Sequence, residues 1–570
     1  VIDVSVVANQ PMASPDGRFV IVFNGEIYNY RSLRKEISNT NPGITFKTQS
    51  DTEVIIHGFA EWGHNLCRKL EGMFALVIYD QLQNQLFICR DRVGKKPLFY
   101  HLSNTHFLFG SEIKSLLTHP VIKDKRSINN DAINSFLHIG YIPEPDTIYN
   151  AIKKFPAGNY AYLKPGLLLN ITPYSNLTEY VAEPRVWKKN DAITELKSTL
   201  SRAVEKRLIS DVPLGAFLSG GTDSSLVVAM ASRLKHEPLK TFSIGFLENK
   251  FDESAFARKV SKQLKTDHHE YILAEQEAVN MLENHFDLFD EPFADTSAIP
   301  MMLVSKLARK EVTVSLTGDG GDELFLGYGS YDWANLLDGF WLRAIQSPLS
   351  FLLRKFGNDR WKRISFLLQH VNPDELRSHI FSQEQYFFTR KEVVGMSAQT
   401  LPQFQNLNYQ EVIAPYLNAG EKQALFDIQY YLKDDLLVKV DRASMHYGLE
   451  CRCPFLDADV IALGLSLPYQ FKKNGRERKW ILKEILREYL PDDLIYRPKQ
   501  GFSIPLAQWL KHELAYLTER YLSKEMVHDI GIVKYPYVHS LKTAFSNGQN
   551  FLYHRLWVLI VAHKWIYEHA

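Results

Sequence analysis

Cysteine is scarce in this sequence, with four residues among 570. Four cysteines are too few for the disulfide framework of a small secreted domain, and Cys451-Arg-Cys453 lacks the second pair of ligands that a zinc site needs. Long apolar runs are missing as well, since no stretch reaches the roughly 18 residues of a membrane-spanning helix, and no charged-then-apolar leader is seen. We therefore expect a chain of the reducing cytoplasm that is neither secreted nor membrane-spanning and has no membrane partner.

An excess of charge of either sign is also missing. Lys and Arg number 66 and Asp and Glu number 65, which gives a net charge of +1. A polyanion such as nucleic acid is therefore not expected as the main partner, and the expected ligands are small molecules. The length of 570 residues exceeds that of one ordinary hydrophobic core, so two or three domains are expected.

The most informative stretch is an apolar run that breaks at residues 219–225, Ser-Gly-Gly-Thr-Asp-Ser-Ser, and resumes with helical spacing. This pattern predicts a strand, a tight loop and a helix. Two adjacent glycines allow close backbone approach, and the amides and hydroxyls around a helix N-terminus favour an anion. The loop is not a P-loop, because no Lys follows the glycines and Asp223 occupies the position of that cation. An Asp beside a phosphate site indicates a bridging metal ion.

The first part of the chain is predicted to be α+β. Short apolar segments at 72–80, 86–90, 97–101 and 107–110 are separated by turn residues, which is typical of an antiparallel sheet. Residues 120–185 contain many Pro, Gly and Asn residues and are expected to form a connection with a little strand of its own. We place the domain boundary near residue 185, which gives domains 1–185 and 186–570.

Strands and helices alternate after this boundary. A helix is expected at 191–210, strands at 240–246, 269–273 and 312–316, and helices at 253–264 and 278–289. This order predicts a parallel sheet covered by helices, whose ligands collect at the carboxyl ends of the strands. The last 240 residues or so are expected to be mostly helical.

A second glycine-rich acidic loop, Thr317-Gly-Asp-Gly-Gly-Asp-Glu, repeats the plan of strand, turn and helix. In a parallel sheet both loops lie at the same edge. Asp223, Asp319 and Asp322 could then surround one cleft, where they would hold Mg²⁺ against phosphate oxygens or bind a substrate ammonium group.

Both loops carry a family resemblance. Residues 219–225 look like the pyrophosphate loop of the N-type ATP pyrophosphatases, and residues 317–325 resemble the second loop of the glutamine-hydrolysing asparagine synthetases. The resemblance implies an α+β glutaminase domain with an N-terminal nucleophile hydrolase-like α-β-β-α sandwich, followed by an α/β parallel-sheet ATP pyrophosphatase domain with a largely helical C-terminal part. It covers almost the whole chain in order, with further matches at residues 23–29, 50–53, 72–75, 90–100, 242–246, 441–445, 450–457 and 478–482.

The resemblance implies that aspartate is converted to asparagine through a β-aspartyl-adenylate, with release of AMP and pyrophosphate. Asp319 would face the adenylate, although many family members have Glu there, and Lys479 would stabilise phosphate charge. For Lys479 a solvent-exposed charged face is the alternative, because other basic residues surround it in the sequence. The further implied residues are Ser219, Gly220, Gly221, Ser224 and Ser225 for pyrophosphate, Asp223 and Asp322 for Mg²⁺, Leu218 and Ile244 beside adenine, and Thr317 and Gly318 for the rest of ATP.

The glutaminase domain would supply ammonia from glutamine through an internal tunnel. By the resemblance, Asn24 and Gly25 would stabilise the oxyanion, and Glu26 and Asp51 would bind the α-ammonium group of glutamine.

The sequence does not contain the N-terminal Cys that the family uses as nucleophile. Cys67 and Cys89 do not replace it, because one lies in a predicted helix and the other in a mid-domain strand, and both are expected to be buried structural thiols. We expect the chain to be a fragment that begins inside the strand after the nucleophile. A natural truncation that uses free ammonia is the alternative.

Two other functions stay open at this point. The same mechanism could act on another carboxylate, such as a sugar acid of a surface polysaccharide or the precursor of a β-lactam ring. A non-catalytic ATP-binding scaffold is the second alternative, and the joint presence of Asp223, Asp319, Asp322 and Lys479 argues against it. A homodimer is left open.

Overall fold

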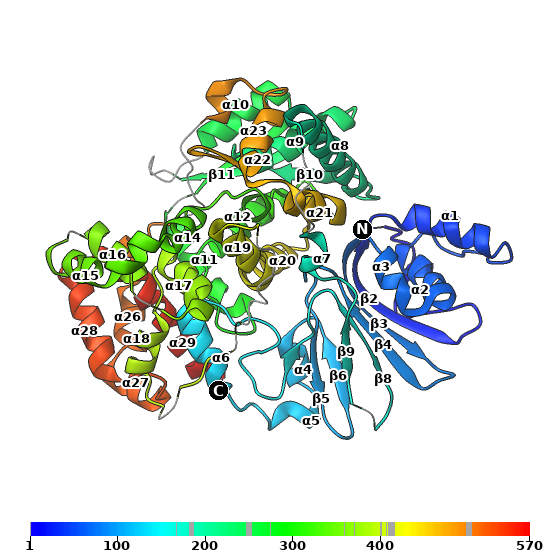
Figure 1. Cartoon of the computed structure of the whole chain (residues 1–570). Helices are drawn as coiled ribbons and strands as arrows, with labels where there is room; N and C mark the ends of the chain where they lie inside the picture. The colour runs from blue at the N-terminus through cyan, green and yellow to red at the C-terminus, as the bar shows by residue number, and fades with distance from the viewer. Residues whose placement is uncertain are drawn as a thin grey trace.

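Two large β-sheets, each covered by helices, make up the framework of the chain in the computed structural model (Figure 1). The structure describes residues 2–569, apart from 167, 182–186, 247–253, 274, 358, 370, 400–401, 406, 408–415 and 497–503. Within this part, no helix is both long enough and apolar enough to cross a bilayer. The predicted domain boundary near 185 lies outside the described residues.

The first sheet is antiparallel, with six strands in the order β1-β2-β3-β4-β8-β9. Its central strand β3 is almost completely buried, because helices α1 (Tyr30–Thr40) and α2 (Asp51–Trp62) cover one face and the three-stranded sheet β6-β5-β7 covers the other. The predicted antiparallel pairing of this region is confirmed. The strands are β1 (Met12–Ala13), β2 (Phe19–Ile27), β3 (Gly72–Asp80), β4 (Gln85–Arg90), β5 (Phe99–Leu102), β6 (Phe107–Gly110), β7 (Lys153–Lys154), β8 (Asn159–Leu163) and β9 (Asn170–Pro173).

Residues 120–185 are more structured than the sequence suggested. They contribute β8 and β9 to the large sheet and the buried helix α6 (Asn130–Ile139) to the core. Gly158 and Gly166 lie in the turns on either side of β8, where a positive φ is required. The strand expected in this segment is therefore confirmed, whereas the buried helix α6 was not predicted.

The second sheet is parallel, as predicted, with strand order β12-β11-β10-β13-β14. Strand β14 was not predicted. The helices α8, α9, α10 and α12 pack against its strands (Figure 1). The bounds are β10 (Leu214–Phe217), β11 (Lys240–Phe246), β12 (Asp267–Leu273), β13 (Val314–Leu316), β14 (Glu450–Arg452), α8 (Lys189–Arg207), α9 (Thr222–Leu234), α10 (Ser254–Leu264), α11 (Glu275–Leu288) and α12 (Ala298–Arg309).

The C-terminal part is mostly helical, as predicted, and it shares a core with the N-terminal part. Phe136 of α6 and Trp557 of α29 belong to one buried apolar cluster, and a π-helical segment (Asp427–Leu436) runs into α20 near the parallel sheet. The main C-terminal elements are α13 (Gly321–Leu324), α14 (Ser330–Asp338), α15 (Phe340–Phe356), α16 (Asp359–Leu367), α17 (Leu376–Glu384), α18 (Arg390–Met396), α19 (Ala419–Phe426), α20 (Leu437–Met445), α21 (Ala458–Ser466), α22 (Tyr469–Lys472), α23 (Trp480–Leu486), α26 (Ala515–Tyr521), α27 (Lys524–Ile530), α28 (Tyr535–Ser546) and α29 (Tyr553–His569).

Candidate functional site

The first glycine-rich loop joins the end of β10 to the start of α9. Gly220 has φ +72°, and a Cβ there would lie 2.9 Å from the backbone nitrogen of Ala257, so that only glycine fits without strain. The hydroxyl oxygens of Ser219 and Ser224 are 3.0 Å apart. The loop therefore closes on itself and directs the N-terminus of α9 toward its open side.

The second loop follows the neighbouring strand β13 and packs directly against the first. A Cβ on Gly318 would lie 2.9 Å from the backbone nitrogen of Ser224, and one on Gly321 would lie 2.5 Å from the Cγ atom of Asp223. Thr317 donates a hydrogen bond to Asp319 with an oxygen–oxygen distance of 2.6 Å. The glycines thus allow the two acidic loops to meet at the carboxyl edge of the parallel sheet, where the sequence placed them.

Lys479 lies between the two aspartates that were expected to bind Mg²⁺. Its ammonium forms ion pairs with Asp223 and with Asp322, the latter with a nitrogen–oxygen distance of 2.7 Å. Only 7% of Lys479 is exposed, so the alternative of a solvent-exposed face is wrong. Burial acts to lower the pKa of Lys479, but the two carboxylates outweigh it and raise the pKa, which keeps the ammonium charged.

The carboxylates of Asp223 and Asp322 are suited to Mg²⁺ that is bound by the protein and the substrate together. No group of three or more metal-binding side chains occurs in the part of the chain that the structure describes. Mg²⁺ typically takes one or two carboxylates, waters and substrate phosphates, which is what the Asp223–Asp322 pair can offer once Lys479 moves aside.

A cavity of about 650 Å³ opens beside the two loops. It is large enough for a nucleotide and a small second substrate. Among the residues expected from the sequence, Gly220, Ser225 and Ile244 do not line it, and Ser225 is buried in α9. The expected residues that do line it are Leu218, Ser219, Gly221, Asp223, Ser224, Thr317, Gly318, Asp319, Asp322 and Lys479.

The sequence analysis missed a second charged group in this cavity. Lys439 of α20 pairs with Asp295 at 2.8 Å and donates to the hydroxyl of Ser297 at 2.7 Å. Although burial opposes it, the Lys439 charge lowers the pKa of Asp295 to about 2. Lys439 stands two residues before the 441–445 motif, which is the signal that could have revealed it.

Glu323, at the cavity wall, has a raised pKa, in contrast to Asp295, whose pKa is lowered. Burial, together with the neighbouring charge of Asp322, raises the pKa of Glu323 to about 7. Tyr328 donates a hydrogen bond to it with an oxygen–oxygen distance of 2.6 Å. Because a carboxyl with this pKa is partly protonated near neutrality, Glu323 can exchange a proton there.

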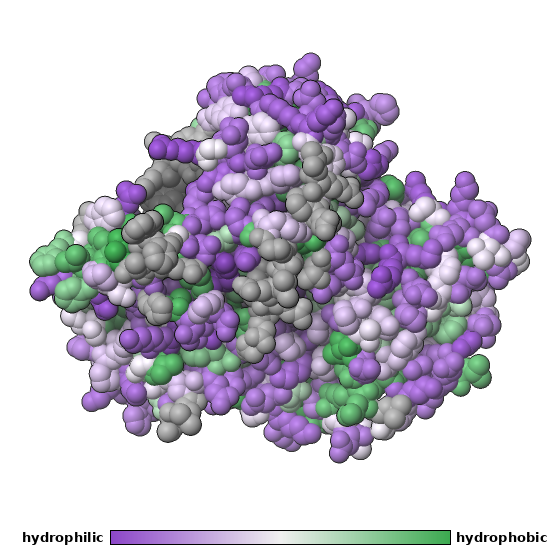
Figure 2. Space-filling view, viewed as in Figure 1, coloured by the Kyte–Doolittle hydropathy of each residue, from purple (hydrophilic) through white to green (hydrophobic). Residues whose placement is uncertain are grey.

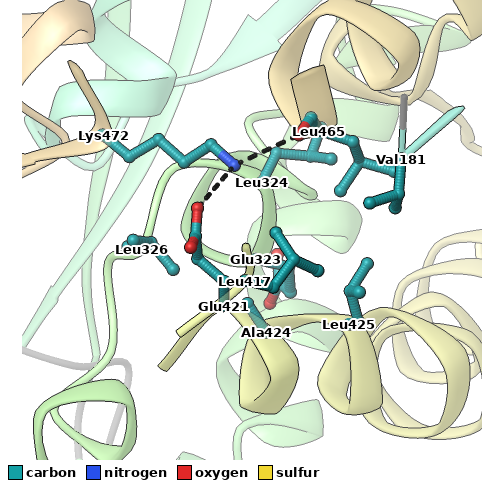
Figure 3. A pocket seen from close by; sticks show the side chains of 10 residues that line it. All are labelled: Val181, Glu323, Leu324, Leu326, Leu417, Glu421, Ala424, Leu425, Leu465 and Lys472. Carbon is teal, nitrogen blue, oxygen red and sulfur yellow. Dashed lines mark hydrogen bonds and ion pairs between the residues drawn. The ribbon is translucent and has the colours of Figure 1, made fainter. Parts of the chain in front are cut away.

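A small space behind Glu323 is not a substrate site. Figure 3 shows the ammonium of Lys472 directed at Glu421 and at the carbonyl of Leu465, with leucine side chains around them. The nitrogen–oxygen distances are 3.6 Å to Glu421 and 3.5 Å to Leu465. The volume of this small space is about 10 Å³, which suffices for no more than a single water molecule.

The four residues expected to bind glutamine gather around the end of β2 and the start of α2. Gly25 has φ +151°, and a Cβ there would lie 2.0 Å from the carbonyl oxygen of Met73. Asn24 donates to Ser111 at 3.1 Å, and Asp51 accepts from the backbone of Ile27 at 2.9 Å.

Glu26 is held by a residue of the parallel sheet. Its carboxylate lies 3.1 Å from the guanidinium of Arg452 in β14. Burial raises the pKa of Glu26 to about 8 and that of Asp51 to about 6.

A lysine pair lies between the two sites. Asp91 accepts hydrogen bonds from the backbone of Lys95 and of Lys96, both at 3.0 Å, and so shapes the loop that carries them. Lys96 forms a buried ion pair of 2.8 Å with Asp441 in the middle of α20. Lys95 is buried, and the charges of Asp319 and Asp441 act on its ammonium.

The thiols of Cys67 and Cys89 are buried next to each other, with the sulfur atoms 3.0 Å apart, and all four cysteines are free. Cys67 lies in α3 (Leu66–Lys69) and Cys89 in β4, as predicted. Burial raises the pKa of the Cys89 thiol well above its usual value, so this thiol is a poor nucleophile.

Comparisons with known proteins agree with this geometry. The family model for asparagine synthase matches residues 195–567, and the model for the glutamine amidotransferase domain matches residues 1–174. The glutamine-hydrolyzing asparagine synthetases 1 and 3 of Bacillus subtilis are each 31% identical to this chain, over 89% and 88% of it and over 79% and 80% of their own lengths. A relative with another name, amidase chry2 of Gibberella zeae, is 25% identical over 94% of this chain and 84% of its own length.

Solved structures resemble the chain only weakly. A glutamine phosphoribosylpyrophosphate amidotransferase from Bacillus subtilis, complexed with ADP and GMP, has a TM-score of 0.21 and 16% identity, covering 46% of this chain and 64% of its own. The sequence matches are far more extensive. With a synthase model over residues 195–567 and relatives aligned over most of their length, the chain belongs to the asparagine synthase family and carries a glutamine amidotransferase domain ahead of the synthase domain.

Proposed function

We propose that this chain makes asparagine from aspartate, ATP and ammonia derived from glutamine. One observation carries the proposal: two glycine loops place Asp223, Asp322 and Lys479 around one cavity at the carboxyl edge of a parallel sheet. Such an arrangement is suited to holding a triphosphate and stabilising a departing pyrophosphate. Activity toward other carboxylates and a non-catalytic scaffold are not favoured, because the two Bacillus subtilis relatives, which match most of the chain at 31% identity, are named asparagine synthetases.

In the first step an oxygen of the aspartate side chain attacks the α-phosphorus of ATP, and the bond to pyrophosphate breaks. The backbone amides of the first loop and the hydroxyls of Ser219 and Ser224 would donate hydrogen bonds to the pyrophosphate oxygens. Lys479 would move from the carboxylates to the phosphates and follow the developing charge. Mg²⁺, held by Asp223 and Asp322, would supply charge neutralisation.

In the second step ammonia attacks the activated carbonyl, AMP leaves, and the nitrogen gives up a proton. Asp319, fixed by Thr317, would lie beside the adenylate. The cavity walls restrict water, which would otherwise hydrolyse the adenylate.

Residues 1–185 would form the glutaminase domain, with an N-terminal nucleophile hydrolase-like sandwich, and residues 186–570 the synthetase domain. Asn24 and Gly25 would stabilise the oxyanion, while Glu26 and Asp51 would bind the α-ammonium group of glutamine. A cytoplasmic location is part of the proposal and can be checked by cell fractionation.

The test is pyrophosphate release in the presence of ATP, Mg²⁺ and ammonium. We expect the rate to rise when aspartate is added and to fall at least about 100-fold in Asp223→Ala. Asp529→Ala, which changes a carboxylate that is 79% exposed, is the matched control. If aspartate has no effect while a sugar acid accelerates release, the mechanism holds and the proposed substrate is wrong. An unchanged rate in Asp223→Ala would contradict the site itself.

A further inference from the structure

A helical hairpin formed by α15 and α16 exposes an apolar surface that the proposed reaction does not use. Ile345, Leu352 and Phe356 on α15 are 52%, 52% and 74% exposed, and Trp361 on α16 is 47% exposed. Figure 2 shows hydrophobic residues gathered at the left edge of the molecule, where α15 and α16 lie in Figure 1. Several apolar side chains of this size rarely lie together on a protein surface unless the surface binds a partner or a membrane.

The exposed residues form a stripe. Positions 345, 352 and 356 are seven and four residues apart, the spacing that places side chains on one face of an α-helix. A neighbouring row, Leu342, Leu349 and Leu353, is partly buried against the cluster that contains Leu337 and Leu367. The hairpin is therefore anchored by one row of apolar side chains and presents the next row to its surroundings.

Basic side chains accompany the stripe. Residues 340–367 contain six basic residues and one acidic residue, although the whole chain has a net charge of only +1. Arg354, Lys355 and Arg360 are exposed. A helix with aromatic and aliphatic residues on one face and Arg or Lys beside them is typical of a segment that lies flat in a membrane interface.

We propose that α15 and α16 bind the surface of an anionic lipid bilayer. Phe356, Leu352 and Trp361 would enter the boundary between headgroups and acyl chains, while Lys355 and Arg360 would meet the lipid phosphates. A second copy of the chain is a less suitable partner, because a twofold contact through this face would bring like charges together. Nucleic acid would leave the apolar stripe in water. The hairpin would lie on the bilayer surface without spanning it. The finding that no helix of the described residues can cross a bilayer is therefore compatible with this proposal.

Vesicle flotation with the full-length chain tests the proposal. We expect binding to vesicles of phosphatidylcholine and phosphatidylglycerol, weak binding to phosphatidylcholine alone, and weaker binding as salt is added. The double variant Leu352→Glu/Phe356→Glu should lower the partition coefficient at least about tenfold, because its side chains no longer favour the acyl region. The matched control is Leu82→Glu/Leu168→Glu, which changes two leucines that are 78% and 91% exposed elsewhere and should bind like the parent chain.

A further variant separates the contribution of the basic side chains to vesicle binding from that of the apolar side chains. Lys355→Gln/Arg360→Gln should weaken the preference for anionic vesicles and leave the melting temperature and the ammonia-dependent activity unchanged. Absence of flotation with anionic vesicles, or equal flotation of the Leu352→Glu/Phe356→Glu variant, would overturn the proposal. A dimer in solution that this variant converts to a monomer, without vesicle binding, would instead identify the face as a contact between copies.

Discussion

Lys479 illustrates how one side chain can serve two states of a site. In the structure its ammonium forms ion pairs with Asp223 and Asp322. Without it, these two carboxylates would repel each other, because they are largely shielded from water. Its backbone, with φ +54° at the start of α23, is unusual for a residue with a side chain and fixes the point from which the ammonium reaches them. The proposed binding of ATP and Mg²⁺ at these carboxylates would therefore displace an existing ion pair.

The first prediction concerns Lys479→Met. Removal of the ammonium leaves two half-buried carboxylates without their cation, so we expect the free energy of unfolding at pH 7 to fall by about 1 to 3 kcal/mol. Mg²⁺ should raise the melting temperature of this variant more than that of the parent chain, because it no longer competes with the ammonium. Thermal unfolding with and without Mg²⁺ measures both effects, with Lys240→Met, an exposed lysine, as control. Equal stabilisation of variant and parent would contradict the competition.

The second prediction is a pH dependence of glutamine binding. Burial holds the pKa of Glu26 at about 8 and that of Asp51 at about 6. Below these values the carboxyls are protonated and do not attract the α-ammonium group, so affinity should rise as the pH increases from 6 to 8. Calorimetric titration with glutamine at several pH values measures this affinity. The affinity should depend less steeply on pH in Glu26→Gln. An affinity that is flat across this interval would show that neither carboxyl carries the recognition.

The regular strands and helices were the most predictable elements. Residues 240–246 were predicted as a strand and form β11, and the loop and helix after β10 were also anticipated, because apolar periodicity and glycine position are local signals. Strand β14 escaped notice, since Glu450-Cys-Arg452 is short and not apolar, and its pairing with β13 depends on a distant part of the chain. The hairpin of α15 and α16 escaped notice for another reason: a search for spanning runs does not detect an amphipathic surface.

The third prediction tests the packing of the two glycine loops. A Cβ in Gly318→Ala would lie 2.9 Å from the backbone nitrogen of Ser224 and should push the loops apart. We expect pyrophosphate release to fall about tenfold or more, together with a lower melting temperature. Gly395→Ala in α18 is the control, because no atom lies within 4 Å of its added Cβ, and it should be neutral or slightly stabilising. Full activity of Gly318→Ala would mean that the close contact of the loops is not needed.

At the scale of the whole molecule, the two sites are joined by buried polar contacts that no local pattern reveals. Lys96 and Asp441 are 345 residues apart in the sequence and form an ion pair of 2.8 Å. Both residues lie within segments that the sequence analysis had matched to the family, but their pairing depends on the tertiary fold. The sequence therefore predicts which groups gather at each proposed site, but it does not predict the contacts between the sites.

The fourth prediction addresses this pair. Lys96→Met or Asp441→Asn alone should each lower the free energy of unfolding by about 3 to 5 kcal/mol, because each leaves a buried charge without its partner. The double variant Lys96→Met/Asp441→Asn should be more stable than the sum of the single changes predicts. Urea unfolding of all four proteins measures the coupling, and simple additivity would show that the pair contributes no mutual energy.

Arg452 belongs to both sites at once. Its carbonyl oxygen accepts a hydrogen bond from the backbone N–H of Thr317 at 2.9 Å, at the base of the second loop, while its guanidinium lies 3.1 Å from Glu26 in the proposed glutamine site. A glutamine ammonium that draws Glu26 toward itself must weaken this ion pair and release Arg452, and the strand that carries it, from one restraint. Binding free energies are reciprocal, so occupancy of either site would alter the affinity of the other by the same factor. The enzyme would then sense its nitrogen donor through a single arginine.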